Sequence, residues 1–296
     1  SRGRGLKALA IFLLYRADPR GIARAFKTLP LDVILSGLLI YLIFNLLKAL
    51  RFHLLLKGEV SISKLTPITM IYTFWSNLLP MRAGDLTYLY MLRADGKVSI
   101  PKGISSLAVG TFFDVALTLS ALMGLGMSLK DQFRGTLPIT TLLIIPGAVV
   151  SLSIGLMALT VLKGGGIPRI SDRGIVARAV GKMVEVVEEI GRFKLKELIL
   201  RILPLSILII SLRFALQCYL IDRMGFGFGW VRTAFALSFT SFCNLLPIQA
   251  VGGIGSVEAP WSWALMGVGE KADEAISAGF SLHGLILGYA LVTGGI

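Results

Sequence analysis

Long runs without a charged residue recur along this chain. Residues 33–47, 135–162 and 233–257 contain no Asp, Glu, Lys or Arg. A helix needs about 20 mostly apolar residues to cross a bilayer, and a water-soluble domain has no reason to hold several such runs. The last apolar segment also carries Gly284 and Gly288 at the spacing of a helix-packing face. The pattern predicts an all-α polytopic membrane protein.

The apolar segments follow the same order in two halves of the chain. Each half has a span containing Arg-Phe, a short apolar segment, a polar turn, a second short segment and a further span. These segments are predicted at 31–56, 66–81, 85–93, 103–128 and 136–162, and again at 198–222, 231–246, 254–268 and 275–295. The short segments cannot cross the bilayer comfortably on their own. We therefore predict two inverted repeats, each with a broken re-entrant helix pair.

The repeats are predicted to form a single membrane domain of residues 1–296, with a first half at 1–162 and a second half at 198–296. Between them, residues 163–197 begin with a glycine-rich breaker and continue with valines at helical spacing opposite a charged face. That pattern predicts an interfacial amphipathic helix joining the halves. The apolar run at 8–15 is too short to span alone, which leaves a shortened first helix, an interfacial segment or a signal-like start.

The tetrapeptide Asn-Leu-Leu-Pro occurs twice, at residues 77–80 and 244–247, in a chain with only three Asn. Proline disfavours a helical conformation at the residue before it, so each short helix should end there. If the two pairs enter from opposite faces, Asn77 and Asn244 come close together. Their carboxamides can donate and accept hydrogen bonds, either to a ligand or to the backbone freed by the proline.

Charged residues follow the first tetrapeptide. Arg82 and Asp85 lie just past its proline, and a charge at mid-bilayer costs about 2.5 kcal/mol or more, which makes it a functional candidate. The planar guanidinium of Arg82 suits a phosphate because it can bond two oxygens at once. The alternatives are an Arg82–Asp85 ion pair and an arginine that reaches up to the interface.

Glycines follow the second tetrapeptide. Gly252, Gly253 and Gly255 precede a short helix that carries Glu258. Successive backbone N–H groups in such a turn can form an anion-binding nest, whereas Glu258 would attract a cationic group. The two halves together favour a head group with both charges. The alternative is close helix packing at the glycines, with Glu258 as a capping carboxylate.

Three further charges lie within predicted spans, namely Arg51, Asp114 and Arg213. They are candidates for ion or proton coupling, and Asp114 and Arg213 lie deep enough in their spans for a pairing. His53 and His283 are more typical of interfacial or packed positions than of a proton relay.

Composition narrows the class of partner. Charged residues make up 16% of the chain, well below the roughly 25% of soluble domains, yet Lys and Arg outnumber Asp and Glu by 30 to 17. The positive-inside bias and anionic lipids explain such an excess, so we predict no nucleic-acid partner. Cys218 and Cys243 lie in apolar context and predict neither a disulfide framework nor a metal site. The scarcity of Asn and Gln favours a thermophile.

The distribution of basic residues predicts an orientation. The first broken pair lies within a basic stretch at 57–103, and the second within an acidic stretch at 222–274. The positive-inside rule then places the first pair at the cytoplasmic side and the second outside.

Three motifs stand in chain order: Arg-Phe-x-Leu-Leu-Leu at 51–56, Asn-Leu-Leu-Pro-Met-Arg-Ala-Gly-Asp-x-x-x-x-Tyr at 77–90, and Leu-Pro-x-x-x-x-Gly-Gly-Ile-Gly-x-x-Glu at 246–258. Together they resemble the lysylphosphatidylglycerol synthase transmembrane (flippase-like) family, from about residue 8 to the end of the chain. The matching positions are Asn77, Pro80, Arg82, Gly84, Asp85, Arg93, Pro247, Gly252, Gly253, Gly255 and Glu258. The chain departs from the family pattern at Asp85, where Glu is expected, and at 87–90, where an arginine often stands near the tyrosine.

The resemblance implies a multi-pass protein of a prokaryotic cell membrane that moves lipids between leaflets, with membrane lipids as its partners. We therefore predict a lipid translocase for a phospholipid or a lipid-linked head group. We expect no enzyme activity and no cofactor, since the aminoacyltransferase domain of the bifunctional relatives is missing from this sequence. The alternatives are a gradient-driven secondary transporter of a small solute and a membrane-embedded transferase or its accessory protein.

Overall fold

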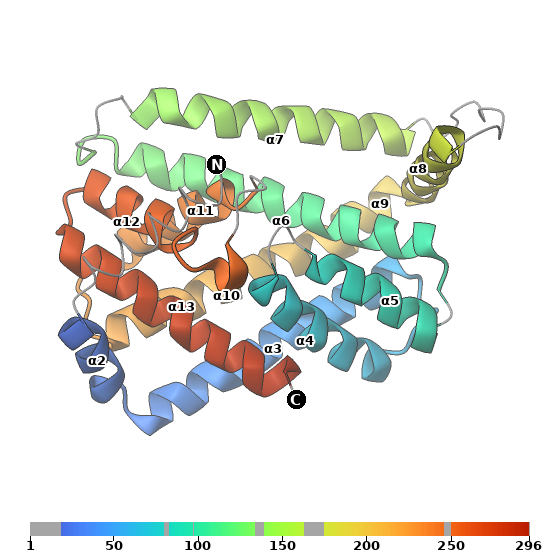
Figure 1. Ribbon diagram of the computed structural model, residues 1–296. Helices are drawn as coiled ribbons and strands as arrows, with labels where there is room; N and C mark the ends of the chain where they lie inside the picture. The colour runs from blue at the N-terminus through green and yellow to red at the C-terminus, as the bar shows by residue number, and fades with distance from the viewer. Residues whose placement is uncertain are drawn as a thin grey trace.

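The computed structural model describes residues 19–79, 83–96, 98–133, 139–162, 175–245 and 250–295, and every regular element in these ranges is helical. The first half contains α2 (Pro19–Thr28), α3 (Leu31–Leu55), α4 (Ile62–Leu78), α5 (Gly84–Gly96), α6 (Ile100–Ser128) and α7 (Ile139–Leu162). The rest contains α8 (Ile175–Gly191), α9 (Leu195–Glu197), a π-helical turn (Leu198–Ile202), α10 (Leu203–Arg223), α11 (Trp230–Cys243), a 3-10 turn (Val251–Gly253), α12 (Glu258–Gly267) and α13 (Ala272–Gly294). Figure 1 shows their arrangement.

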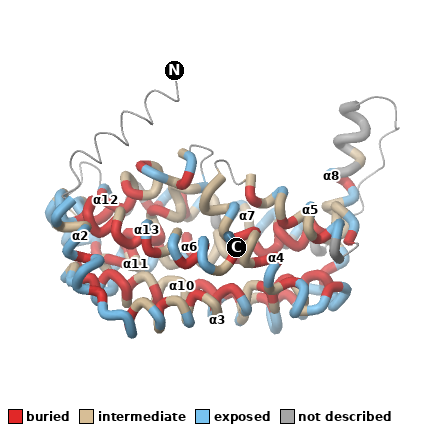
Figure 2. Tube along the Cα trace, turned by 60° about the horizontal axis from the view of Figure 1, so that its bottom comes forward, coloured by how far each residue is buried: buried red, intermediate tan, exposed pale blue. Residues whose placement is uncertain are grey.

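Four helical segments of the described chain are long and apolar enough to cross a membrane: α3, α6, α13 and the continuous stretch Leu195–Arg223 that ends in α10. They turn large apolar side chains outward, such as Leu35 on α3, Leu208 on α10 and Leu291 on α13. In Figure 2, exposed positions alternate with buried ones along the outer helices. A soluble protein would bury these leucines, whereas a bilayer solvates them. The prediction of a helical membrane protein with several apolar spans is confirmed.

The short helices end where the repeated tetrapeptide predicts. α4 stops at Leu78, and Leu79 is extended with φ −86° and ψ 137°, the conformation that a following proline imposes. α5 then returns along α4, and a Cβ on Gly84 would lie 2.3 Å from the backbone nitrogen of Ser76. Only glycine allows two backbones to come this close. The helices α4, α5, α11 and α12 have 17, 13, 14 and 10 residues, each below the ~20 that a crossing needs.

The two halves exchange contacts in a matching pattern. α3 packs against α10, so the first spans of the two halves lie side by side. α4 packs against α13, the last span of the second half, and α11 packs against α6, the corresponding span of the first half. In Figure 1 the pair α4–α5 lies toward one end of the long helices and the pair α11–α12 toward the other. Each short pair is thus held by a span of the opposite half.

Three features differ from the sequence-based prediction. α2 was not predicted, because its arginines hide a short amphipathic helix that buries Ala25 and packs against α13. α12 begins at Glu258 rather than at residue 254, because the preceding glycines adopt positive φ. Gly284 and Gly288 are exposed, and a Cβ on Gly288 would meet nothing within 4 Å. A Cβ on Gly284 would meet the Phe26 ring of α2 at 3.6 Å, so the two glycines do not form one shared packing face within the described chain.

The linker helix is present, as α8, and it packs against α6 and α7. It buries Val184 while Met183 stays 69% exposed. The glycine-rich breaker before it and the apolar run at 8–15 lie outside the described residues.

The close packing of α13 on α4 makes a testable prediction. A Cβ on Gly294 would lie 2.3 Å from the Met70 carbonyl oxygen, so Gly294→Ala must push the helices apart. We expect a loss of about 1–3 kcal/mol, measured as a lower thermal unfolding midpoint in detergent. Gly288→Ala in the same helix is the matched control and should be neutral or stabilising by at most about 1 kcal/mol. Equal midpoints for the two variants would contradict the packing described above.

Candidate functional site

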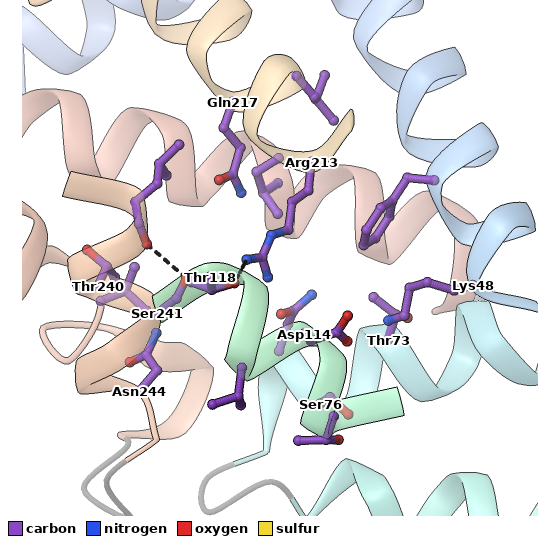
Figure 3. A pocket seen from close by; sticks show the side chains of 18 of the residues that line it. Lys48, Thr73, Ser76, Asp114, Thr118, Arg213, Gln217, Thr240, Ser241 and Asn244 are labelled. Carbon is purple, nitrogen blue, oxygen red and sulfur yellow. Dashed lines mark hydrogen bonds between the residues drawn. The ribbon is translucent and has the colours of Figure 1, made fainter. Parts of the chain in front are cut away.

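A cavity of about 390 Å³ lies among the helices. All four apolar spans line it, together with the short helices α4, α11 and α12. Phe52 and Leu107 on its wall belong to an apolar core built mainly from the first half, and Leu216 and Leu237 belong to a second core built mainly from the other half. The cavity therefore lies where the two halves meet, and Figure 3 shows the polar side chains that point into it.

Arg51 and Asp114 form a bidentate ion pair in the wall of the cavity. The Arg51 Nη1 donates to Oδ1 at 2.6 Å, and Nη2 donates to Oδ2 at 2.8 Å. Nη1 also donates to the Ser206 hydroxyl at 3.1 Å, so the pair ties α3 and α6 to α10. The Arg51 side chain is 1% exposed and that of Asp114 31%. Two parallel charge-assisted hydrogen bonds are the geometry that best offsets the cost of burying both charges.

Arg213 lies beside this pair without joining it. Its Nη2 donates to the Thr118 hydroxyl at 3.2 Å, and Thr118 follows Asp114 by one turn of α6. The possible ion pair between Asp114 and Arg213 does not form, because both carboxylate oxygens of Asp114 accept hydrogen bonds from Arg51. The sequence could not decide this, since either arginine is near enough to mid-span to reach the acid.

Lys48 is a cavity residue that was not among the site residues predicted from the sequence. Its Nζ donates to the Thr73 hydroxyl at 3.1 Å and lies 5.3 Å from the centre of the Phe44 ring and 5.0 Å from that of Tyr72. Aromatic faces attract a cation at such distances. Lys48 precedes Arg51 by one helical turn, and that spacing was the available signal that both point the same way.

The described residues that line the cavity carry an excess of positive charge. Lys48, Arg51 and Arg213 are cations, whereas Asp114 is the one carboxylate among them. Lys48 and Arg213 both interact electrostatically with Asp114, in addition to its partner Arg51. One acid thus stands among three bases in an apolar protein interior.

Both copies of the repeated asparagine line this cavity. Asn77 comes from the end of α4, and Asn244 directly follows α11. Ser76 and Ser241 lie next to them on the same two helices and also face the space. The two repeated asparagines therefore lie on the wall of the same cavity.

The glycine turn before α12 adopts the conformations that glycine favours. Gly252, Gly253 and Gly255 have φ of +64°, +70° and +82°. The Gly255 N–H donates to the Glu258 Oε2 at 2.6 Å. The carboxylate bound by this turn is thus the protein's own, at the N-terminus of α12, where the helix dipole favours negative charge.

Glu258 is fully buried, and its second oxygen lies 2.6 Å from the His283 Nδ1. His283 lines the cavity, whereas Glu258 stands behind it. The arrangement matches the capping alternative for Glu258 rather than a carboxylate that presents its charge to a ligand. His283 was not among the predicted site residues, and its distance along the chain from Glu258 leaves no local signal.

The other predicted site residues lie elsewhere. Asp85 is in the first turn of α5, half-buried and away from the cavity lining. Arg93 lines a separate hollow between α5, α6 and α8, across from Glu185. Arg82 lies outside the described residues, as do both prolines of the tetrapeptides.

The lining contains further polar groups that the sequence did not single out: Thr73, Thr118, Gln217 and Thr240. Ser206 reaches Arg51 from behind. Such hydroxyls are common in membrane helices, and only the packing shows which of them face a cavity. Among the described residues, no three His, Cys, Asp or Glu side chains gather as a metal site.

Comparison with known families agrees with the motifs. A family model described as "Lysylphosphatidylglycerol synthase TM region" matches residues 5–294. The chain belongs to this family. As a member of the lysylphosphatidylglycerol synthase transmembrane family, it is a membrane protein linked to lipid modification or transport. Searches of curated proteins and of solved structures found no match.

The Arg51–Asp114 pair predicts a large stability effect. Asp114→Asn leaves a buried guanidinium without its carboxylate, which should cost about 3–5 kcal/mol. The measurement is the thermal unfolding midpoint in detergent. Glu59→Gln is the matched control, because its pair with Lys102 is exposed on both sides and should contribute about 1 kcal/mol or less. A midpoint for Asp114→Asn as high as that of the control would contradict the buried pair.

The capping role of Glu258 predicts a graded response. Glu258→Ala removes the acceptor of the Gly255 N–H and the partner of His283, so we expect a loss of about 3 kcal/mol. Glu258→Gln keeps an acceptor oxygen, so its loss of stability should be smaller than that of Glu258→Ala. Glu274→Ala, in the exposed first turn of α13, should leave the free energy of unfolding within about 0.5 kcal/mol of wild type. A Gln variant as unstable as the Ala variant would mean that the carboxylate does not act through these hydrogen bonds.

Proposed function

We propose that this protein is a lipid translocase, in which the head group of a phospholipid or lipid-linked compound passes through the cavity between the two halves. The observation that carries the proposal is a polar, charged cavity lined by all four apolar spans. A head group would exchange its hydration for these side chains while its acyl chains stay in the bilayer. The protein moves the lipid without changing it covalently, so neither enzyme activity nor a cofactor belongs to the proposal.

We propose further that the two halves are inverted repeats and that α4–α5 and α11–α12 are re-entrant pairs. The exchanged packing of α4 with α13 and of α11 with α6 supports a two-fold relation. The position of the pairs at opposite ends of the long helices supports entry from opposite faces (Figure 1). Transporters of this design open a central site alternately to either side by rocking one repeat against the other.

Irregular backbone within a membrane is tolerated where it lines a cavity or is buried in protein. Asn77, in the last turn of α4, and Asn244, directly after α11, both line the cavity next to these breaks. The broken helices thus have a role that supports translocation, because they allow polar groups to reach the centre of the bilayer.

The test is transbilayer movement of fluorescent phospholipids in proteoliposomes, read as loss of fluorescence to an external quencher. Wild-type protein should accelerate movement above protein-free vesicles. Ser241→Trp should reduce it at least about tenfold, because the indole fills the cavity that Ser241 lines.

Ser120→Trp is the matched control. Ser120 is exposed on α6 and bonds the carbonyl four residues before it, as Ser241 does on α11. It should keep wild-type movement. No acceleration by the wild type for any lipid would overturn the proposal, and ion-gradient-driven uptake of a soluble solute would then favour a secondary transporter, with Asp114 as the coupling group.

A further inference from the structure

We propose that the cavity recognises a negatively charged phosphate or phosphodiester group and holds it between Lys48 and Arg213. The inference rests on the proposed function in one respect: if the protein is a lipid translocase, the bound phosphate is part of a lipid head group. It replaces the zwitterionic head group expected from the sequence, which needed Glu258 to present its charge.

The charge balance of the cavity is the first argument. Among the described lining residues, three side chains are cationic and one is anionic. Charges inside a membrane protein are costly unless they are paired, and they mark the path of a charged substrate. The net excess of two positive charges calls for an anion of one or two charges.

The distribution of partners is the second argument. Both carboxylate oxygens of Asp114 accept hydrogen bonds from Arg51, so this carboxylate is already paired with a cation. The Lys48 Nζ donates to the Thr73 hydroxyl, and the Arg213 Nη2 donates to the Thr118 hydroxyl. The Nε of Arg213 is buried and has no hydrogen-bond acceptor within the described part of the chain.

The third argument is the set of donors around the space. Figure 3 shows Lys48 on α3 and Arg213 on α10 reaching into the same cavity near Asp114. The hydroxyls of Thr73 and Thr118 accept from these cations, and their O–H groups stay able to donate to a ligand oxygen. Two cations with adjacent hydroxyl donors are the chemistry that binds phosphate, and the planar guanidinium adds the option of two parallel bonds.

The site also selects against the opposite charge. A cationic group in the cavity would approach Lys48 and Arg213, while the one carboxylate, Asp114, is engaged with Arg51. Glu258 does not compensate, because it is buried behind His283 and bound to the Gly255 N–H. Repulsion of wrong partners contributes to specificity as much as attraction of the right one.

The test compares three short-chain lipids with the same acyl chains, bound to the full chain in detergent. The probes are a phosphatidylglycerol, a phosphatidylcholine and a cationic diacyl lipid without phosphate. Wild-type protein should bind the anionic lipid roughly tenfold more tightly than the zwitterionic one and the cationic lipid least. Equal affinity for all three, or a preference for the cationic lipid, would overturn the inference.

Substitutions test whether Lys48 and Arg213 cause the preference for the anionic lipid. Lys48→Met and Arg213→Gln should each reduce the affinity for phosphatidylglycerol about tenfold and remove most of the preference. Lys48→Arg should keep it, because the charge is retained. Arg223→Gln, an exposed arginine at the far end of the same helix as Arg213, is the matched control and should bind as wild type does. Loss of the preference in this control but not in Lys48→Met and Arg213→Gln would place the anion elsewhere and overturn the assignment.

Two further measurements distinguish a free phosphate from a lipid as the ligand, and the anion site from the translocase as proposals. Competition by inorganic phosphate or glycerol phosphate would show that the phosphate alone suffices, and its absence would show that a lipid is required; in both cases the charge preference must hold. If the protein prefers to bind the anionic lipid but moves no lipid across the bilayer, the translocase is contradicted and the anion site is supported. If it moves all lipids at equal rates and has no binding preference, the translocase is supported and the anion site is contradicted.

Discussion

The buried pair of Arg51 and Asp114 is the interaction around which this structure is arranged. Neither charge could enter an apolar bundle alone, and their bidentate contact, joined by a hydrogen bond to Ser206, pairs the two charges. The pair joins α3, α6 and α10, which come from both halves of the chain. It also requires a polar surrounding, because the exposed edge of Asp114 cannot face lipid. The cavity with Lys48 and Arg213 is that surrounding.

Breaking the helices is what makes such a cavity possible. A continuous span satisfies all its backbone groups internally and can present only side chains, whereas a helix that stops in mid-membrane exposes its end. α4 and α11 stop beside the cavity and deliver Asn77 and Asn244 there. The start of α12 is closed by the protein itself, because Glu258 accepts a hydrogen bond from the Gly255 N–H.

The two halves are equal in packing and unequal in chemistry. α4 of the first half packs against α13, and α11 of the second half packs against α6. Yet the first half supplies Lys48, Arg51 and Asp114, while the second supplies Arg213 and His283. The positive excess that we propose to bind a phosphate comes from both halves.

The membrane class, nearly all of the helices and the family could be predicted from the sequence, because apolar periodicity and proline act locally. Arg51, Asp114, Arg213 and both asparagines could be selected in the same way, since a charge or a repeated motif inside a span is recognisable in the sequence. Which of these residues meet depends on how the helices pack. Side-chain pairing depends on helix rotation and packing, so Asp114 paired with Arg51 rather than Arg213, Lys48 joined the site, and Glu258 turned inward to cap its own helix.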